Sequence, residues 1–316
     1  MNDFARDWAP YRLERLKRPE QGQEWLCRWF SRAGRRYSEP FFQETVTRCL
    51  EEQPNGKPYA SFSSLDFLAH AAKNADAVAP SAFIFHVSRC GSTLLAQLLG
   101  LDRAHIVLSE VPLIDQLLRL PLRSDISHDA AASMLQATIV LLGERRFGET
   151  RLFVKLDSWH IHYAGLLRAL YPDTPFILLS RTPHEILRSQ RAERGTHAVP
   201  GLLEPALFGL CAEDVSDCDA DSYLGKVLAY YYARFAELAH DRRNLLLDFR
   251  LGPQEMMQRL AQHIGMEIGA DMRQQIRERS RFHSKRPHNA FSEAPVQEPV
   301  PACLVSAEEA YRRLGF

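Results

Sequence analysis

The chain has 316 residues, of which 39 are Lys or Arg and 39 are Asp or Glu, so its formal net charge is zero. This length allows one large α/β domain with an appendage, or two modest domains. A neutral chain lacks the basic charge of a nucleic-acid binder, and no apolar run approaches the roughly 20 residues that span a bilayer. The N-terminal residues are charged throughout, and the six cysteines lie scattered without metal-site spacing. We therefore expect a cytoplasmic protein with reduced thiols that binds neither nucleic acid nor a membrane, its oligomeric state remaining open.

Apolar residues near the start of the chain recur at helical spacing. They are Trp25, Leu26, Trp29 and Phe30, followed by Phe41, Phe42, Val46 and Leu50. A turn is expected at 54–58, and another helix begins after Ser64. We therefore predict that residues 1–78 form a helical N-terminal extension that packs on the core.

From about residue 80 onward, short apolar runs alternate with helical patterns. Strands are predicted at 82–87, 105–108, 151–156, 175–180 and 244–249, and helices at 92–100, 129–144, 160–170, 183–193, 222–240, 253–264 and 270–280. This alternation predicts an α/β domain with a parallel sheet covered on both faces. We expect the domain to span 79–293, with a Pro-rich linker and a C-terminal helix over 294–316. Ligands of such sheets bind at the carboxyl ends of the strands.

A tight polar turn, Ser88-Arg89-Cys90-Gly91-Ser92-Thr93, separates the first of these strands from the next helix. The N–H groups at a helix start are unpaired, and the helix dipole adds positive potential there. Gly91 lets the backbone approach an anion, Ser92 and Thr93 offer hydroxyl groups, and Arg89 offers a permanent charge. The turn therefore predicts an anion-binding loop, although it lacks the first glycine and the lysine of the ATPase loop G-x-x-x-x-G-K-[ST].

A second candidate phosphate ligand follows the strand predicted at 175–180. Arg181 ends this strand, Pro183 opens the next helix, and Ser189 stands eight residues after Arg181. Arginine suits bidentate capture of phosphate, and proline is tolerated in the first turn of a helix. The alternative is that Arg181 forms only a structural ion pair with Glu185.

Together these two segments resemble the sulfotransferases that use 3′-phosphoadenosine 5′-phosphosulfate (PAPS) as donor. The loop of that family runs Pro-Lys/Arg-Ser-Gly-Thr/Ser-Thr, and this chain has Ser88 for the proline and Cys90 for the first serine. The segment from Arg181 to Ser189 is similar to the family's 3′-phosphate motif. The resemblance covers about residues 80–290 and implies a P-loop three-layer sandwich with a central parallel sheet, here with the N-terminal helical extension.

The resemblance also implies which residues bind the donor. The 5′-phosphate would be held by loop residues, and the 3′-phosphate by Arg181 and Ser189. A late basic loop of the family closes over the donor, and Ser284 and Lys285 stand in the corresponding stretch although the family's Arg-Lys-Gly form is absent. The implied 5′-phosphate ligands are Arg89, Cys90, Gly91, Ser92, Thr93 and Leu94. No metal is implied, and His160 and His162 make a poor metal site without a third ligand.

The implied reaction is sulfuryl transfer to a hydroxyl or amine of a small-molecule or peptide acceptor. Arg89 would stabilise the leaving phosphate electrostatically, and Lys155 would assist the sulfuryl oxygens. Asp157 falls where one branch of the family places a catalytic histidine in Lys-x-His, and Glu110 falls where other members carry a glutamate base. Either carboxylate could deprotonate the acceptor. Glu110 is preferred slightly, and for at least one of the two a cap or ion-pair role is expected.

Two other functions remain open from the sequence. A Mg²⁺-dependent P-loop kinase for small molecules is suggested by Leu245-Leu-Leu-Asp248, a strand that ends in a possible metal ligand. The other is a nucleotide-binding protein without catalytic activity. Magnesium dependence separates the kinase from the sulfotransferase, and turnover of any acceptor excludes the silent binder.

Overall fold

The computed structural model describes residues 7–18, 22–52, 61–216, 218–282 and 299–316. Its contacts divide the chain into two units. Unit 1 comprises Met1–Ser81, Leu99–Lys155 and Ala169–Pro172, and unit 2 comprises Ala82–Leu98, Leu156–Arg168 and Asp173–Phe316. The predicted boundaries at 78/79 and 293/294 stay predictions, and the first part of the Pro-rich linker lies outside the described residues.

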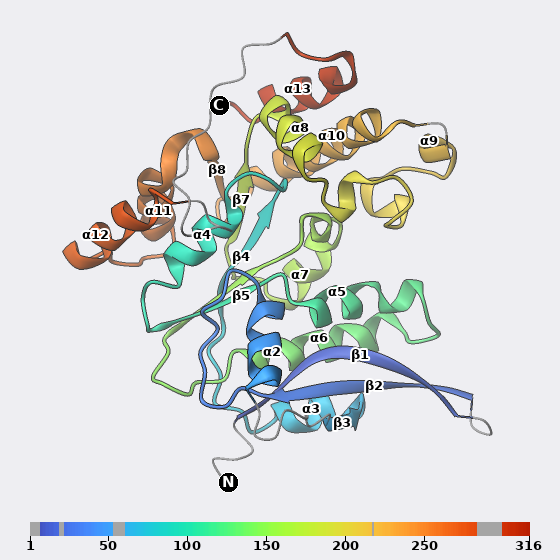
Figure 1. The fold of residues 1–316 in the computed structure, drawn as a ribbon, viewed down its shortest axis with the longest axis vertical. Helices are drawn as coiled ribbons and strands as arrows, with labels where there is room; N and C mark the ends of the chain where they lie inside the picture. The colour runs from blue at the N-terminus through green and yellow to red at the C-terminus, as the bar shows by residue number, and fades with distance from the viewer. Residues whose placement is uncertain (1–6, 19–21, 53–60, 217, 283–298) are drawn as a thin grey trace. The chain divides into compact units, whose positions relative to one another are not determined.

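A five-stranded parallel sheet has the order β5-β6-β4-β7-β8, and a separate three-stranded sheet has the order β1-β2-β3 (Figure 1). The predicted α/β class is therefore confirmed. The five parallel strands lie within a residue or two of their expected positions: β4 Pro80–His86, β5 His105–Ser109, β6 Arg151–Lys155, β7 Phe176–Ser180 and β8 Leu245–Asp248.

The helices after β4 also follow the predicted pattern. They are α4 Ser92–Leu99, α5 Pro112–Arg119, α6 His128–Leu142, α7 Ala164–Leu170, α8 Pro183–Ala192, α9 Glu213–Ser216, α10 Ala220–Ala239, α11 Gly252–His263, α12 Ala270–Arg279 and α13 Val305–Arg312, with 3₁₀ segments η1 Leu120–Leu122, η2 Ser158–Tyr163, η3 Thr196–Ala198, η4 Pro205–Phe208, η5 Phe249–Leu251 and η6 Ala302–Leu304. Among the described residues, no helix is both long and apolar enough to cross a membrane.

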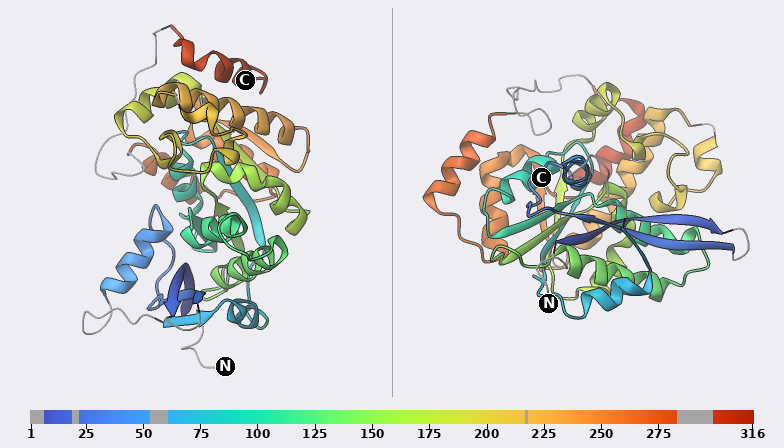
Figure 2. Two further views of the ribbon diagram at one scale, coloured as in Figure 1. Left: turned by 90° about the vertical axis from the view of Figure 1, so that its right-hand side faces the viewer. Right: turned by 60° about the horizontal axis from the view of Figure 1, so that its bottom comes forward.

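The N-terminal part corrects the predicted helical extension. Trp8–Arg18 (β1) and Gly22–Ser31 (β2) pair as antiparallel strands and form a long ribbon (Figure 2), to which Ser61–Ser64 (β3) is added. Burial alternates in β1 after the register shift at Pro10, where Tyr11 and Leu13 are at most 5% exposed and Arg12 between them is exposed. This period of two is that of a strand, and the aromatic residues of β2 favour a strand as well.

Two helices of the N-terminal part are confirmed. Helix α2 spans Phe42–Glu51 and helix α3 spans Asp66–Ala72. The turn expected at 54–58 lies outside the described residues.

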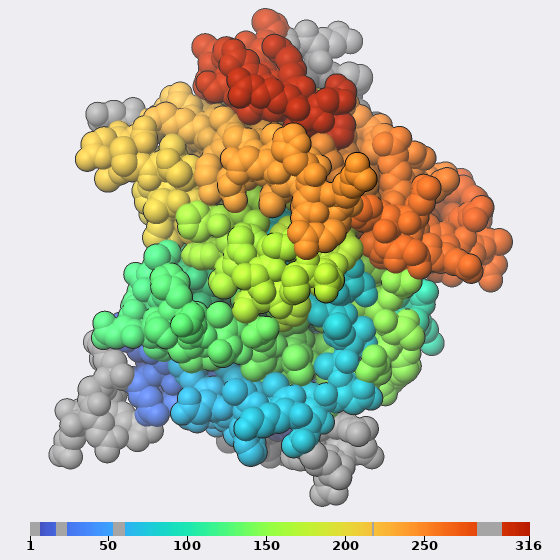
Figure 3. Space-filling model, turned by 180° about the vertical axis from the view of Figure 1, so that it is seen from behind, coloured from blue at the N-terminus to red at the C-terminus, as the bar shows by residue number. Residues whose placement is uncertain are grey.

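The core of unit 2 is built on the strands β4 and β7, which pair in parallel with Phe83 opposite Phe176. The ring of Phe176 lies 6.0 Å from that of Phe83 and 5.0 Å from that of Phe85, in edge-to-face contacts. All three are fully buried. Helix α13, red in Figure 3, packs on α10, where a Cβ added to Gly225 would lie 1.9 Å from the carbonyl oxygen of Cys303. This rigid core fixes the loops that follow the strands.

Candidate functional site

The predicted anion loop of unit 2 has a strained backbone. It follows β4 directly, and Ser88, Arg89 and Gly91 have φ angles of 63°, 48° and 79°. Gly91 adopts this left-handed conformation without strain, whereas for Ser88 and Arg89 it costs about 1–3 kcal/mol of conformational free energy each. A tight turn after a strand can direct successive N–H groups toward one side and so form an anion-binding concavity. The loop keeps this conformation only because surrounding side chains hold it.

His86 is the first of these side chains. It is 5% exposed at the end of β4, and its Nδ1 accepts the N–H of Ser88 at 3.1 Å. The Nε2 of the ring lies 2.8 Å from the carbonyl oxygen of Leu156. Because Nδ1 acts as acceptor, the proton of the neutral ring is on Nε2, which donates to Leu156. His86 thus ties the loop to the segment after β6.

Gln190 of α8 holds the loop from a second side. Its side chain is fully buried, and its Nε2 donates to the Ser88 hydroxyl at 3.3 Å. The same nitrogen lies 3.2 Å from Nε2 of His197, and Oε1 accepts the N–H of Gly195 at 2.8 Å. Both Nε2 and Oε1 of this buried amide therefore have hydrogen-bond partners, which are Ser88, His197 and Gly195.

Arg181 reaches the loop from the end of β7. It is 5% exposed, its Nη1 donates to the carbonyl of Arg89 at 2.9 Å, and its guanidinium lies 4.7 Å above the Phe249 ring. Its Nε lies 3.4 Å from Oε2 of Glu185, so the structural ion pair considered as the alternative is present. Arg181 therefore places a buried cation at the loop, with a carboxylate as counter-charge.

Arg89 itself lies at the loop but pairs with the end of α8. Its Nη2 lies 3.2 Å from Oε2 of Glu193 and also donates to the carbonyl of that residue. The Glu193 side chain is 68% exposed. Ion pairs with so exposed a partner contribute little, so exchange of Glu193 for a bound phosphate costs little.

The remaining predicted donor ligands lie just before α4, at its start or on α8, except for two that fall outside the described residues. Gly91 is covered by Phe249, because a Cβ added to this glycine would lie 2.4 Å from the Phe249 ring. Ser189 is half-buried on α8, eight residues beyond Arg181 as predicted. Ser284 and Lys285 lie outside the described residues. The four other predicted loop ligands after Arg89 are at most 7% exposed: Cys90, Ser92, Thr93 and Leu94.

Unit 1 brings two of the predicted catalytic residues together. Ser109 and Lys155 are partners in the β5–β6 pairing, so Glu110 follows β5 beside the end of β6. Lys155 Nζ forms an ion pair with Glu110 Oε1 and lies 5.3 Å from the Phe41 ring centroid. The Lys155 side chain is fully buried and that of Glu110 is 26% exposed. Glu110 has a φ of 52°, so its position is held against backbone strain.

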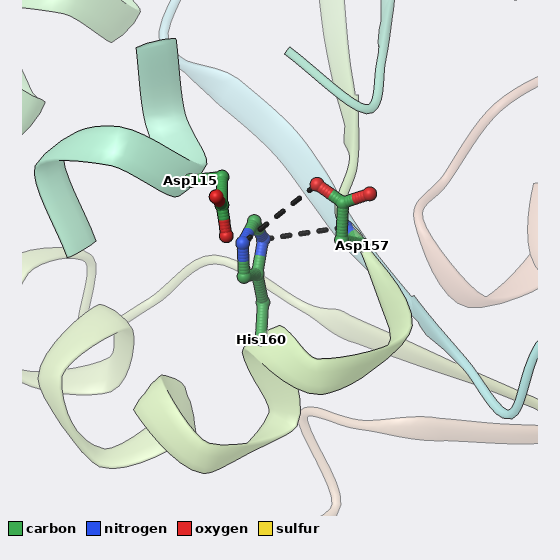
Figure 4. Close-up of side chains that lie close together, drawn as sticks. All are labelled: Asp115, Asp157 and His160. Carbon is green, nitrogen blue, oxygen red and sulfur yellow. Dashed lines mark hydrogen bonds and ion pairs between the residues drawn. The ribbon is translucent and has the colours of Figure 1, made fainter. Parts of the chain in front are cut away.

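Asp157, the other candidate base, has a structural role in unit 2. It is the N-cap of η2 in a capping box with His160. The main-chain N–H of Asp157 donates to Nδ1 of His160 at 3.2 Å, and His160 Nε2 lies 3.7 Å from the Asp157 carboxylate (Figure 4). Asp115, also drawn in Figure 4, belongs to unit 1 and pairs with Arg119. Both carboxylates therefore make one of the structural contacts expected for at least one of them, since Asp157 caps η2 and Glu110 forms an ion pair with Lys155.

Asp248, the possible metal ligand of the kinase hypothesis, is buried in a hydrogen-bond network. One carboxylate oxygen accepts both the main-chain N–H and Nε of Arg250 at 2.8 Å, and the other accepts the Tyr311 hydroxyl at 2.6 Å. Burial and this bond to Asp248 raise the pKa of Tyr311 far above its ordinary value. Asp248 therefore joins β8 to α13, which favours a structural role over magnesium binding.

Three residues at the site were not identified from the sequence, namely His86, Gln190 and Phe249. His86 carried a signal, since it is the polar residue in the apolar run of β4. Gln190 follows the predicted ligand Ser189 directly, but nothing in its spacing indicates a contact with residue 88. Phe249 reads as an ordinary core residue.

Several solved structures are similar to this chain, and they are sulfotransferases. A sulfotransferase domain from the curacin biosynthetic pathway matches at 13% identity with a TM-score of 0.48, covering 76% of this chain and 99% of that domain. Sulfotransferase STF9 from Mycobacterium avium matches at 14% identity and a TM-score of 0.43, over 67% of this chain and 71% of its own. Mouse sulfotransferase SULT7A1, solved as a complex with PAP, matches at 13% identity with a TM-score of 0.40. The match covers 76% of this chain and 78% of that one.

No established family profile matches the chain, and no curated protein does. At the identities of these structures, no residue role passes from them to this chain.

Proposed function

We propose that this protein is a sulfotransferase that moves a sulfuryl group from PAPS to a hydroxyl or amine of a small-molecule or peptide acceptor. The observation that carries the proposal is the strained loop after β4, held by Arg181 through the carbonyl of Arg89. Both segments of the sulfotransferase resemblance thus meet in one network of unit 2. A kinase does not need Arg181 and Ser189 as ligands of a second phosphate group, because ATP carries no 3′-phosphate.

In the proposed reaction, the bond between sulfur and the phosphate oxygen breaks while a bond from sulfur to the acceptor forms. The acceptor proton passes to the Glu110 carboxylate, and 3′-phosphoadenosine 5′-phosphate (PAP) leaves. Negative charge grows on the leaving phosphate, where the loop N–H groups and Arg89 act, and Lys155 assists the sulfuryl oxygens. No metal takes part.

The first test is calorimetric titration of protein treated with a chelator, using PAP and, in parallel, ATP with Mg²⁺. Selective binding of PAP without metal supports the donor assignment, and binding of ATP with Mg²⁺ alone overturns it. Transfer of labelled sulfate from PAPS is then screened over phenols, alcohols, amines and tyrosine peptides. Binding of PAP without transfer to any acceptor would favour the silent nucleotide-binding protein.

A further inference from the structure

The contacts of Gln190 determine how the Ser88 hydroxyl is used. The N–H of Gly195 can only donate, so the side-chain atom that accepts it at 2.8 Å must be Oε1 of Gln190. This fixes the orientation of the amide and makes Nε2 the atom that faces Ser88 and His197. Nε2 has two protons and no lone pair. Ser88 Oγ and His197 Nε2 are therefore both acceptors.

Ser88 is left with one donor that faces away from its neighbours. Its main-chain N–H is taken by Nδ1 of His86. Its Oγ accepts from Gln190, so the hydroxyl proton must point elsewhere, and the described residues offer it no acceptor. The side chain is half-buried in the left-handed part of the loop. Ser88 can therefore contact a ligand through its hydroxyl and not through its N–H.

We propose that Ser88 is an additional donor to an anionic oxygen at the 5′ end of the bound nucleotide, and that Gln190 is the positioning residue that turns the Ser88 proton toward it. The inference rests on the proposed function and adds a ligand at a position where the resembling family has proline. The ring of His197, which lies 6.5 Å from Trp159 and 6.2 Å from Tyr231, is held by these aromatic contacts. It gives Gln190 its second acceptor.

The test compares two nucleotides that differ only at the 5′ end, PAP and adenosine 3′-monophosphate. Hydrogen bonds to charged groups are strong enough that Ser88→Ala is expected to weaken PAP binding by about 10- to 100-fold. Binding of adenosine 3′-monophosphate should be unchanged. Ser280→Ala is the matched control, because the Ser280 hydroxyl also makes one hydrogen bond, to the carbonyl of Ile276. Affinity for PAP should not change in this control.

A second pair of variants separates positioning from loss of structure. Ser88→Gly also removes the hydroxyl but accepts the left-handed φ readily, so it should keep the fold and still lose PAP affinity. Gln190→Met should weaken PAP binding in the wild-type background and have little further effect when Ser88 is already alanine. Such coupling is the signature of Gln190 acting through Ser88.

The outcomes separate the two proposals. If the wild type does not bind PAP, the proposed function fails, and this inference fails with it. If the wild type binds PAP and Ser88→Ala and Ser88→Gly bind it equally well, only the inference is overturned. Equal losses for both nucleotides would also overturn it, because Ser88 would then shape the site without contacting the 5′ group.

Discussion

The Nη1 of Arg181 donates to the main-chain carbonyl of Arg89 at 2.9 Å, which links two segments 92 residues apart in the chain. A carbonyl that accepts from a buried guanidinium cannot rotate freely, so this bond helps to hold Arg89 in its left-handed conformation. The same guanidinium supplies positive charge at the loop. Arg181 thus has a structural role, and the ion pair with Glu185 is compatible with the proposed role of Arg181 in phosphate binding.

Replacement of Arg181 should therefore affect both stability and binding. We expect Arg181→Ala to lower the thermal midpoint and to weaken PAP binding by about 100-fold, because strong charge-assisted bonds are lost. Arg181→Lys keeps the charge but not the planar fork, so it should recover only part of the affinity. Calorimetry and thermal unfolding measure both effects. Arg277→Ala on the exposed side of α12 is the control, and an unchanged affinity in Arg181→Ala would refute the binding role.

Gly91 and Gly252 provide a matched pair for the loop. Both have a positive φ, 79° and 78°, but a Cβ at Gly91 meets the Phe249 ring at 2.4 Å whereas one at Gly252 meets nothing within 4 Å. Gly252→Ala should cost about 1–3 kcal/mol of unfolding free energy through backbone strain alone, because a φ of 78° with a ψ of 160° is almost restricted to glycine. Gly91→Ala should cost about 2–4 kcal/mol because overpacking is added. Denaturant titration measures the difference, which should shrink when Phe249 is also alanine.

The Glu110–Lys155 pair should respond asymmetrically to loss of one partner. Lys155 is fully buried while Glu110 is 26% exposed, so water can solvate the carboxylate but not the ammonium. Glu110→Gln leaves an unpaired buried charge and should cost about 3–5 kcal/mol, more than Lys155→Met. If Glu110 is the base, Glu110→Gln should also lower the transfer rate by at least about 100-fold while PAP affinity is kept. A transfer rate equal to that of the wild type would exclude Glu110 as the base.

Asp157 is predicted to act as a cap and not as a base. Asparagine caps helices as well as aspartate does, so Asp157→Asn should leave stability and sulfuryl transfer close to those of the wild type. Asp157→Ala should lose about 1 kcal/mol of unfolding free energy. Steady-state rates and thermal unfolding of the two variants decide the point. Abolished transfer in a stable Asp157→Asn protein would reassign the base to this residue.

Stability in acid should depend on Asp241. Hydrogen bonds from the side chain and the main chain of Arg243 lower the pKa of Asp241 from 3.8 to about 2. Because the folded-state pKa is the lower one, this stabilisation is complete above about pH 4 and is lost as the pH falls toward 2. The thermal midpoint of the wild type should exceed that of Asp241→Asn at pH 6, and the gap should close near pH 2. A gap that stays constant across this range would contradict the assignment.

Local pattern was sufficient for much of this protein. Short stretches of sequence predict the alternation of buried strands and amphipathic helices from β4 to α12, since each strand contains an apolar run and each helix has its own periodicity. The loop at Ser88–Thr93 and the strand end at Arg181 were recognised for the same reason. For residues 8–31, however, aromatic residues fit both a helix and a strand, and antiparallel pairing of β1 with β2 decided between them.

Contacts between distant residues were decided only by the tertiary structure. The sequence left both Glu110 and Asp157 as candidate bases, and only the structure shows that Glu110 faces a buried lysine while Asp157 caps η2. Gln190 likewise became visible only when α8 was placed beside the loop, 102 residues away from Ser88. Spacing along the chain determines which chemistry is present, whereas the path of the chain determines which partner each polar group must satisfy once water is excluded.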